Sequence, residues 1–386
     1  VVTNPQQRYS YSARVDHSLN ARDSLFVRYS GSPSDGTQRG SDFVSPNVWT
    51  SQESRSQAIT GAWIRVMSST SSNDLRVNYS GSNGKSWGGM DNFGGAVALT
   101  DAQVFPKGID STNGAYSMSI LGLASYSLGA RGRQEQRQIN VVDGLSFSAG
   151  SHTYKVGADY RSQNSTTFNV PYSLMTTFNG LSAQDGSALS GYATMASVSS
   201  SVPEVYPSTT NYSFYVQDTW RADSRTTITY GVRWDVNPAP SAWKGSQPFA
   251  ISSASETRVS QADPLYNTRW TDFAPRLGFV RQVKATPGRE LVLRGGFGIF
   301  HDPGYGSSMS AFSGAPYSNV RSLTSPLFPL ASSDLSAPVL PATKPYGQLG
   351  AAERTLQSPA IWQWNATLER SYGPAQVLSI GYAGTR

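Results

Sequence analysis

The sequence predicts an all-β fold, an antiparallel transmembrane β-barrel of the outer-membrane type of which about twelve strands are present. Three observations support this prediction. Apolar and polar residues alternate with a period of two in segments of about ten residues. Short turns and long connections rich in Ser, Gly, Pro and Asn alternate between these segments. The apolar side of one strand in each hairpin ends in an aromatic residue, at a similar distance from the turn.

Composition excludes several other classes. Charged residues are 15% of the 386 positions, against about 25% in ordinary soluble domains. An aromatic content of 11% excludes intrinsic disorder. The chain has no run of about 18 apolar residues, which excludes a helical membrane protein. The absence of cysteine excludes disulfide scaffolds, thiolate metal sites and cysteine nucleophiles.

The distribution of charged residues predicts no nucleic-acid partner, and the spacing of the histidines predicts no enzyme. The 31 Lys and Arg residues exceed the 25 Asp and Glu residues by six, but they form no basic runs. The three histidines, His17, His152 and His301, lie at strand ends or turns, so their spacing suggests no metal site or catalytic triad. We therefore expect no enzymatic activity, no cofactor and no metal.

Six hairpins are predicted, each centred on a short turn. They span residues 8–31, 55–82, 134–162, 210–236, 269–301 and 359–385. The long connections between them span residues 31–54, 83–133, 163–209, 237–268 and 302–358. Short turns on one side and long loops on the other are typical of outer-membrane barrels, whose turns are periplasmic and whose loops are extracellular.

The whole chain, residues 1–386, is interpreted as part of one barrel domain, with a plug domain and further strands outside it. The first predicted strand begins near residue 8 and the last ends with the chain. Two arrangements are compatible with this. One is a curved open sheet whose terminal strands each lack a partner on one side. The other is a narrower barrel in which those two strands pair with each other.

The second strand of each hairpin carries an apolar row that ends in an aromatic residue. In the fourth hairpin this row runs from Ile228 to Trp234, and the complementary row contains Thr229 and Arg233. A soluble sandwich has no reason to place aromatics at one height in six hairpins, whereas a membrane interface does. The predicted lipid-facing aromatic girdle is Tyr29, Tyr79, Tyr160, Trp234, Phe297 and Tyr382, together with Trp220 beside a short turn.

Two facing assignments stay open at this stage. In the strand 55–67, either the row from Ala58 to Val66 or the row of Ile59, Trp63 and Met67 could face lipid. In the strand 211–220, the apolar row places Asp218 outward, which is costly at mid-membrane. A β-bulge or a position near the headgroups would resolve that cost.

Five arginines fall on the polar rows and are candidates for the lumen. They are Arg28, Arg76, Arg161, Arg233 and Arg294. They could form a lumen that attracts anions, because Arg presents a fixed fork of donors. The preferred interpretation is that they pair with inward acids such as Asp16, Asp159 and Asp235, or with a domain that fills the pore.

Aromatic residues in the long connections are expected to be exposed and are candidates for contact with a solute, although packing within the loops would also explain each of them. These loop-contact candidates are Trp87, Phe93, Tyr305 and Tyr317.

Several stretches, taken in order, resemble the barrel of TonB-dependent receptors, and most of all the Oar-like group. They are NYSFYVQDTWR at 211–221, ITYGVRWD at 228–235, FAPRLGF at 273–279, RGGFGIFHD at 294–302, WQWN at 362–365 and GYAGTR at 381–386. The resemblance implies a barrel of about 22 strands, a plug, a TonB-contacting box and usually an N-terminal carboxypeptidase-regulatory-like domain.

The resemblance also implies a function, energised uptake of a scarce solute through the outer membrane of a diderm bacterium. The implied partners are outer-membrane lipid, the plug and TonB complex through parts not in this sequence, and an unidentified small solute or oligomer. The alternative is a smaller passive pore or surface adhesin of about 12 to 16 strands. A third interpretation, a soluble or fibrous secreted β protein, requires the apolar rows to be buried in a core.

Overall fold

The computed structural model describes residues 3–183, 186–251, 259–303, 305–341 and 346–386. These residues form one sheet of 19 strands and a second sheet of two strands. Helices are short, and none in the described ranges is long and apolar enough to cross a membrane. The predicted all-β class is confirmed.

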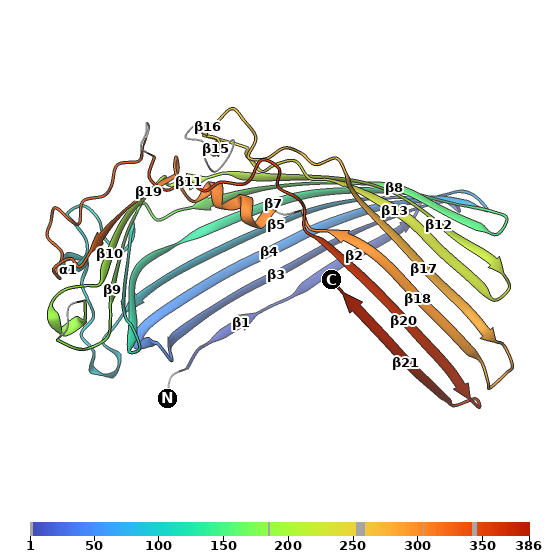
Figure 1. The fold of residues 1–386 in the computed structure, drawn as a ribbon, viewed down its shortest axis with the longest axis horizontal. Coiled ribbons are helices and arrows are strands. Elements are labelled where there is room, and N and C mark those ends of the chain that lie inside the picture. The colour runs from blue at the N-terminus through green and yellow to red at the C-terminus, as the bar shows by residue number, and fades with distance from the viewer. Residues whose placement is uncertain (1–2, 184–185, 252–258, 304, 342–345) are drawn as a thin grey trace.

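Twelve strands form a continuous antiparallel meander in which each pairs with the next (Figure 1). These strands are β2 (Tyr11–Ser18), β3 (Asp23–Ser41), β4 (Val44–Ser68), β5 (Ser71–Met90), β7 (Ala124–Ala149), β8 (His152–Phe168), β12 (Pro207–Asp223), β13 (Thr226–Val236), β17 (Asp272–Lys284), β18 (Leu291–His301), β20 (Ala360–Tyr372) and β21 (Gln376–Thr385). They correspond to the six predicted hairpins, which are therefore confirmed. Figure 1 shows the long connections at one end of the sheet and the short turns at the other.

The meander is open at both edges in the described part of the chain. Strand β2 pairs with β3, and β21 pairs with β20, but β2 and β21 do not pair with each other. The short strand β1 (Gln6–Arg8) also pairs with β3 and continues the β2 edge. The structure is thus the curved open sheet, the first of the two predicted arrangements.

Several strands are longer than the sequence predicted. Strand β4 has 25 residues and β7 has 26, whereas a tilted strand needs about 9 to 11 to cross a bilayer. The segment 31–54, predicted as a loop, is mostly a continuation of β3 and β4, so that prediction was wrong. Beyond the bilayer both faces of a strand meet water, and the alternation of apolar and polar residues that marks a strand disappears.

The other long connections are also structured where they are described. Strands β6 (Gly114–Ile120), β9 (Tyr172–Phe178), β10 (Met195–Ser201) and β19 (Ser318–Thr324) pair in that order beside the start of β7. The shorter elements are η1 (Phe93–Gly95), α1 (Asp101–Val104), η2 (Ala188–Ser190), β11 (Glu204–Val205), β14 (Ser241–Ala242), β15 (Ala250–Ile251), β16 (Val259–Ser260), α2 (Tyr305–Ser308) and η3 (Met309–Phe312).

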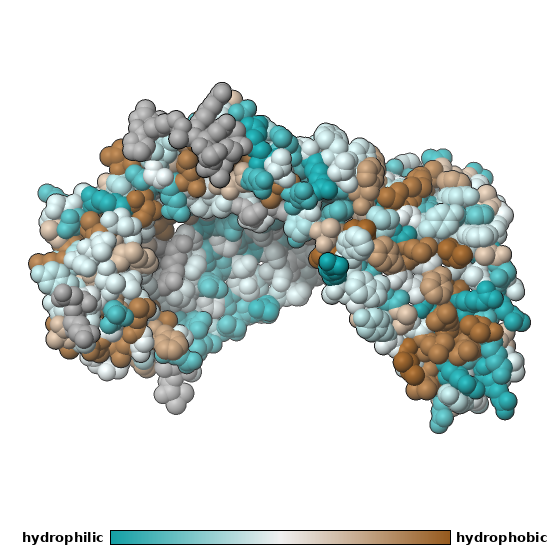
Figure 2. Space-filling model, viewed as in Figure 1, coloured by the Kyte–Doolittle hydropathy of each residue, from teal (hydrophilic) through white to brown (hydrophobic). Residues whose placement is uncertain are grey.

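The buried apolar clusters lie mainly in these connections. One contains Tyr116, Tyr172 and Leu174, and another contains Tyr266 and Phe312. The apolar rows of the wall are instead exposed: Ile380 is 64% and Tyr382 is 65% accessible. Figure 2 shows hydrophobic atoms on the surface over β17–β21 and a mainly hydrophilic hollow under the arch. A sandwich with the girdle aromatics in one core is therefore excluded.

The register settles the facing of the strand 55–67. Ile59 lies between Tyr29 and Tyr79 on the neighbouring strands, and Gly61 lies between two valines of the same apolar rows. The row of Ile59 and Trp63 therefore shares the apolar face, and the row from Ala58 lies on the polar face.

The register also places Asp218. It pairs regularly with Tyr154 and Tyr230, so there is no bulge at this position, and the nearest irregularity follows Arg221. The side chain is only 5% exposed because His152 and Tyr230 cover it. The His152 Nδ1 lies 2.6 Å from one carboxylate oxygen, and the Tyr230 hydroxyl donates to the same oxygen at 2.8 Å. This carboxylate on the apolar row is compensated by partners close to the short turn.

We predict that the apolar rows face lipid, and a pair of arginine substitutions tests this. Val232 lies opposite Val216 on the apolar face, and Thr229 lies opposite Thr219 on the polar face. Val232→Arg should lower the free energy of unfolding by about 2 to 4 kcal/mol near the bilayer midplane. Thr229→Arg should be tolerated, because its side chain points to the other face. The measurement is urea unfolding of the refolded protein in lipid vesicles, and equal losses at the two positions would contradict the assignment.

Candidate functional site

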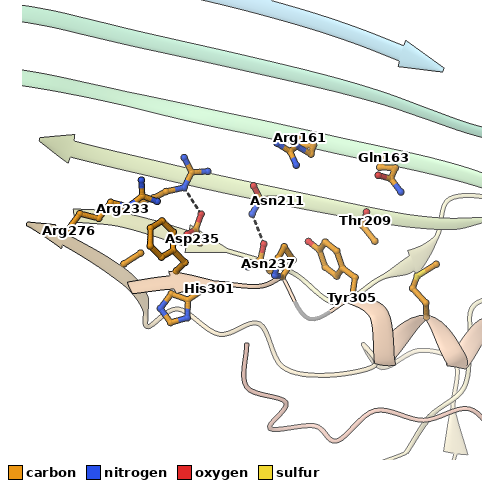
Figure 3. Close-up of a pocket in the computed structure, with 14 residues that line it drawn as sticks. Arg161, Gln163, Thr209, Asn211, Arg233, Asp235, Asn237, Arg276, His301 and Tyr305 are labelled. Atoms are coloured by element: carbon orange, nitrogen blue, oxygen red, sulfur yellow. Dashed lines mark hydrogen bonds and ion pairs between the residues drawn. The ribbon is translucent and has the colours of Figure 1, made fainter. Parts of the chain in front are cut away.

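The polar face of the wall contains a cavity of about 340 Å³ between the strands β8, β12, β13, β17 and β18 and the segment that follows β18. We call it the inner-wall cavity (Figure 3). Arg161 and Gln163 come from β8, and alternate with Tyr160 of the apolar row. The remaining lining residues are Thr209, Asn211, Arg233, Asp235, Asn237, Ala274, Arg276, Phe300, His301, Pro303, Tyr305 and Met309. The strand residues reach the cavity because side chains at alternate positions share a face.

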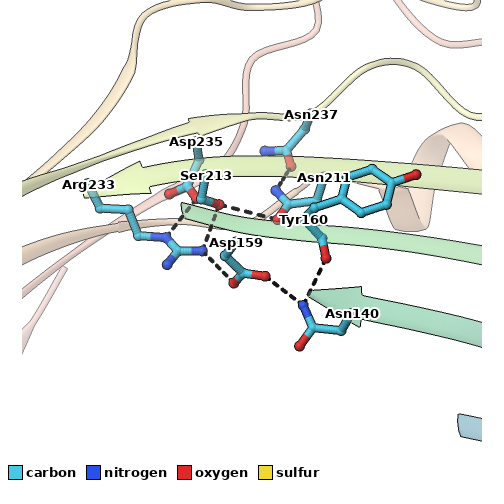
Figure 4. A network of polar contacts seen from close by, with 8 residues as sticks. All are labelled: Asn140, Asp159, Tyr160, Asn211, Ser213, Arg233, Asp235 and Asn237. Carbon is cyan, nitrogen blue, oxygen red and sulfur yellow. Dashed lines mark hydrogen bonds and ion pairs between the residues drawn. The ribbon is translucent and has the colours of Figure 1, made fainter. Parts of the chain in front are cut away.

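Arg233 is held by two acids beside this cavity. Its Nε donates to Asp235 at 2.9 Å, and its Nη2 donates to Asp159 at 3.2 Å and to the Ser213 hydroxyl at 2.6 Å. The Ser213 hydroxyl in turn donates to Asp235 at 2.6 Å. The network joins side chains on β8, β12 and β13, as Figure 4 shows. Arg233 is therefore a charge-compensated residue of the wall.

The network extends to a fourth strand. Asn140 of β7 donates to Asp159 at 2.6 Å and to the backbone carbonyl of Tyr160 at 3.0 Å (Figure 4). On the other side, Asn211 donates to Asn237 at 2.5 Å. Side chains on β7, β8, β12 and β13 are thus joined on the polar face, in addition to the backbone ladder.

Two other arginines of the cavity have no acid partner among the described residues. Arg161 and Arg276 both line the cavity and form no ion pair within those ranges. The guanidinium of Arg276 lies over the ring of Phe300, 4.5 Å from its centroid. These two cations give the inner-wall cavity the chemistry of a site for anionic or strongly polar groups.

The segment containing α2 is fixed to the wall by Tyr305. Its hydroxyl donates to the backbone carbonyl of Thr210 at 2.5 Å. Burial raises the pKa of Tyr305 above its usual value, the nearby Tyr266 raises it further, and the charge of Arg161 opposes the shift. Burial also raises the pKa of Tyr266 to about 12. Both phenols therefore remain neutral hydrogen-bond donors at physiological pH.

The five arginines predicted for the lumen do not form one cluster. Arg161 and Arg233 line the inner-wall cavity, and the other three lie elsewhere on the wall. Arg76 pairs with Asp74 at 2.6 Å on its own strand, and Arg294 pairs with Glu369 at 3.2 Å.

Arg28 lies directly opposite Arg14, and it is Arg14 that pairs with Asp16, at 2.6 Å. The three acids named from the sequence are therefore all paired with arginines, and Arg233 takes two of them.

The loop-contact candidates differ in accessibility. Trp87 lies on strand β5 and is not in a loop; its ring is 4.7 Å from the Lys85 ammonium. Phe93 lies in η1, with the Arg39 guanidinium 4.9 Å from its ring centroid. Both rings are partly accessible, so they stay predicted contact residues.

The expectation that Tyr317 is exposed was wrong. Only 5% of its surface is accessible, since it packs in a buried apolar cluster and its ring stacks on Phe312 at 5.7 Å. Its hydroxyl donates to the Ser246 carbonyl at 2.6 Å. Tyr317 therefore stabilises the loops from within.

The girdle aromatics contact aromatic residues on neighbouring strands. Such cross-strand pairs stabilise a sheet. The ring pairs are Tyr11 with Tyr29 at 6.1 Å, Tyr160 with Tyr212 at 5.4 Å, Trp234 with Phe273 at 6.0 Å, Phe297 with Trp362 at 5.9 Å, and Trp220 with His152 at 5.7 Å. Tyr79 and Tyr382 are exposed on the same face. The facing of these residues toward lipid stays a prediction.

Sequence reasoning missed Arg276, His301 and the inward position of α2. Arg276 alternates with the apolar Leu277 in the same phase as the other inward arginines, so the alternation could have identified it. No local pattern indicates that the segment after β18 lies against the polar face. The described residues contain no group of three or more His, Asp or Glu side chains that could hold a metal ion.

Comparison with known proteins identifies the family of the chain and solved structures that share its fold. A family model described as "Outer membrane beta barrel domain" matches residues 1–386. No curated protein matches the sequence.

Several solved structures share the fold at low sequence identity. The outer membrane transporter YddB from Escherichia coli is 11% identical, with a TM-score of 0.54 over 98% of this chain and 40% of its own. The ferric-catecholate import receptor Fiu from E. coli is 10% identical, with a TM-score of 0.54 over 98% of this chain and 51% of its own. The copper transporter OprC is 11% identical, with a TM-score of 0.53 over 99% and 45%. The chain thus spans about half the length of these proteins.

The polar network predicts that two arginines of the same cavity differ in their contribution to stability. Arg233→Met leaves Asp159 and Asp235, which are 12% and 13% exposed, without their cation. We expect the free energy of unfolding to fall by about 1 to 3 kcal/mol, a value reduced for partial solvent screening. Arg161→Met serves as the matched control and should cost less than about 1 kcal/mol, because no carboxylate depends on it. Urea unfolding in vesicles measures both, and equal losses would show that the ion pairs do not stabilise the wall.

Proposed function

The chain belongs to the outer membrane beta barrel domain family and is an outer-membrane protein, and on that premise we propose that it forms part of the wall of a TonB-dependent receptor. This receptor would take up a scarce solute by an energised route and would not be an enzyme. The proposal includes further strands that pair with β2 and β21, a plug inside the completed barrel, and the TonB complex as partner.

One observation carries the proposal. A single curved sheet with two free edges superposes over at least 98% of its length on outer-membrane transporters and receptors, and occupies about half of each. An open edge in hydrocarbon leaves backbone groups unpaired, at several kcal/mol each. A wall of this kind therefore needs additional strands, which a large barrel supplies.

The inner-wall cavity supports a role in solute passage. Arg161 and Arg276 offer unpaired guanidinium groups on the polar face, next to the α2 segment on the loop side of the wall. Solute contact by the long connections, with Trp87 and Phe93 among the exposed candidates, belongs to the same proposal. Assignment to the Oar-like group, with its usual N-terminal domain, rests on the ordered sequence motifs.

The second candidate function is a passive pore of about 12 to 16 strands, favoured by the hydrophilic hollow in Figure 2. Ion conductance separates the two. In a planar bilayer bathed in potassium chloride, we expect the full-length protein to show no steady conductance, because a plug closes the barrel. A passive pore would conduct continuously, and that result would exclude the receptor mechanism.

Genetics provides a matched test in cells. Deleting the receptor gene, deleting TonB, or deleting both should produce the same growth defect when the solute is limiting, because the receptor is inactive without energy transfer. If deleting the receptor gene lowered growth further in a strain that already lacks TonB, energised uptake would be contradicted.

A further inference from the structure

The apolar face of the wall changes character just beyond the predicted aromatic girdle. Four residues in register across β3, β4, β5 and β7 mark the girdle height: Tyr29, Ile59, Tyr79 and Ile139. The next residues on the same face, further from the short turns, are Gly31, Gln57, Gly81 and Arg137. The step is two residues of about 3.4 Å along a strand tilted by about 45°, a rise of about 5 Å. This rise brings the next row of residues into the headgroup region of the leaflet on the loop side.

A hollow of about 440 Å³ opens on this face at that height. We call it the outer-wall hollow. Tyr79 borders it at the girdle height, and Tyr11, Gly81 and Arg137 border it in the next row, where Tyr11 lies opposite Gly31. Arg55 borders it one step further toward the loops. A Cβ atom on Gly81 would meet only one backbone oxygen, at 3.8 Å, so the missing side chain leaves open space.

The charged residues around the outer-wall hollow leave cationic groups available. The charged residues of this face that lie around the hollow are the cations Arg55, Lys85, Arg133 and Arg137 and the carboxylates Asp35, Glu53 and Glu135. Glu135 is bound by Arg133, and lies 4.0 Å from the Arg137 guanidinium.

Arg55 contacts Glu53 through one nitrogen at 2.7 Å. The side chains of Arg55 and Arg137 are 74% and 71% exposed. Since a guanidinium has five N–H donors, most donors of both residues face solvent at the headgroup height.

The cationic patch is local. Continuing across the wall on the same face, Asn164 lies opposite Arg137, and Ser208 lies opposite Asn164. These positions carry no charge, and Ser208 donates to Asn164 at 2.7 Å. If these arginines served only to attract the membrane surface in general, we would expect them at this height on every strand and not only on β4 and β7.

We propose that the outer-wall hollow binds the phosphorylated headgroup of an anionic lipid in the leaflet on the loop side. Phosphate accepts bidentate hydrogen bonds from arginine, and Arg55 and Arg137 border one hollow with most of their donors exposed to solvent. Tyr79, one row nearer the short turns, lies where the glycerol or sugar part of a headgroup meets the acyl chains. The site faces away from the lumen, so it is independent of the solute.

The test measures lipid binding to the full-length protein in detergent by native mass spectrometry, with lipid A as the probe. Arg55→Gln with Arg137→Gln should weaken lipid A binding about tenfold to a hundredfold, since one charge-assisted contact accounts for roughly tenfold and the double variant removes two. The matched control removes two exposed arginines at the short turns, Arg22→Gln with Arg225→Gln, and should change binding less than about twofold. Arg55→Lys with Arg137→Lys keeps the charge and should retain intermediate affinity.

Three outcomes would overturn the proposal. They are unchanged lipid A binding by the double glutamine variant, an equal loss in the short-turn control, or displacement of lipid A by millimolar inorganic phosphate alone. The last would identify a site for free anions. Binding is compared only between variants that keep the heat-modifiable gel mobility of a folded barrel.

Discussion

In hydrocarbon, a backbone N–H or C=O group without a partner costs several kcal/mol, and the rest of this structure depends on meeting that requirement. The twelve long strands pair with their sequence neighbours almost without interruption, with irregularities near turns or outside the predicted bilayer span. Two edges of about ten residues each would cost far more than the 5 to 15 kcal/mol that stabilises a typical protein. The free sides of β2 and β21 are for this reason the strongest argument that the described wall is part of a larger barrel.

A wall one strand thick has no interior, so its side chains stabilise it by other means. On one face, cross-strand aromatic pairs add to the ladder; on the other, the Arg233 network joins four strands. The buried apolar clusters lie instead in the connections, where β6, β9, β10 and β19 pair with one another. Because these connections have their own core, they hold a defined shape at the loop end of the wall.

Sequence alone predicted the features that follow from the membrane. Each short turn, and the phase of the apolar row on the second strand of each hairpin, came from period-two alternation, which is strong where one face meets lipid and the other meets water. The phase of the strand 55–67 needed the register of its neighbours. The alternation is lost beyond the bilayer, which is why the extension of β3 and β4 was missed. Tyr317 was misplaced because an aromatic residue in a loop looks the same in sequence whether it packs inward or faces solvent. The inner-wall cavity joins residues from Arg161 to Met309, a juxtaposition that only tertiary structure provides.

Because successive side chains of a strand point to opposite faces, neighbouring residues lie in different surroundings. On β7, Asn140 joins the polar network, whereas Arg137 and Glu135 lie on the opposite face beside the outer-wall hollow. On β8, Arg161 borders the inner-wall cavity while the adjacent Tyr160 stacks against Tyr212 on the apolar face. A change of side chain on one face leaves the backbone ladder and the other face in place. The proposed solute contact on the inside and the proposed lipid contact on the outside are therefore structurally separable in this wall, although they share the same strands.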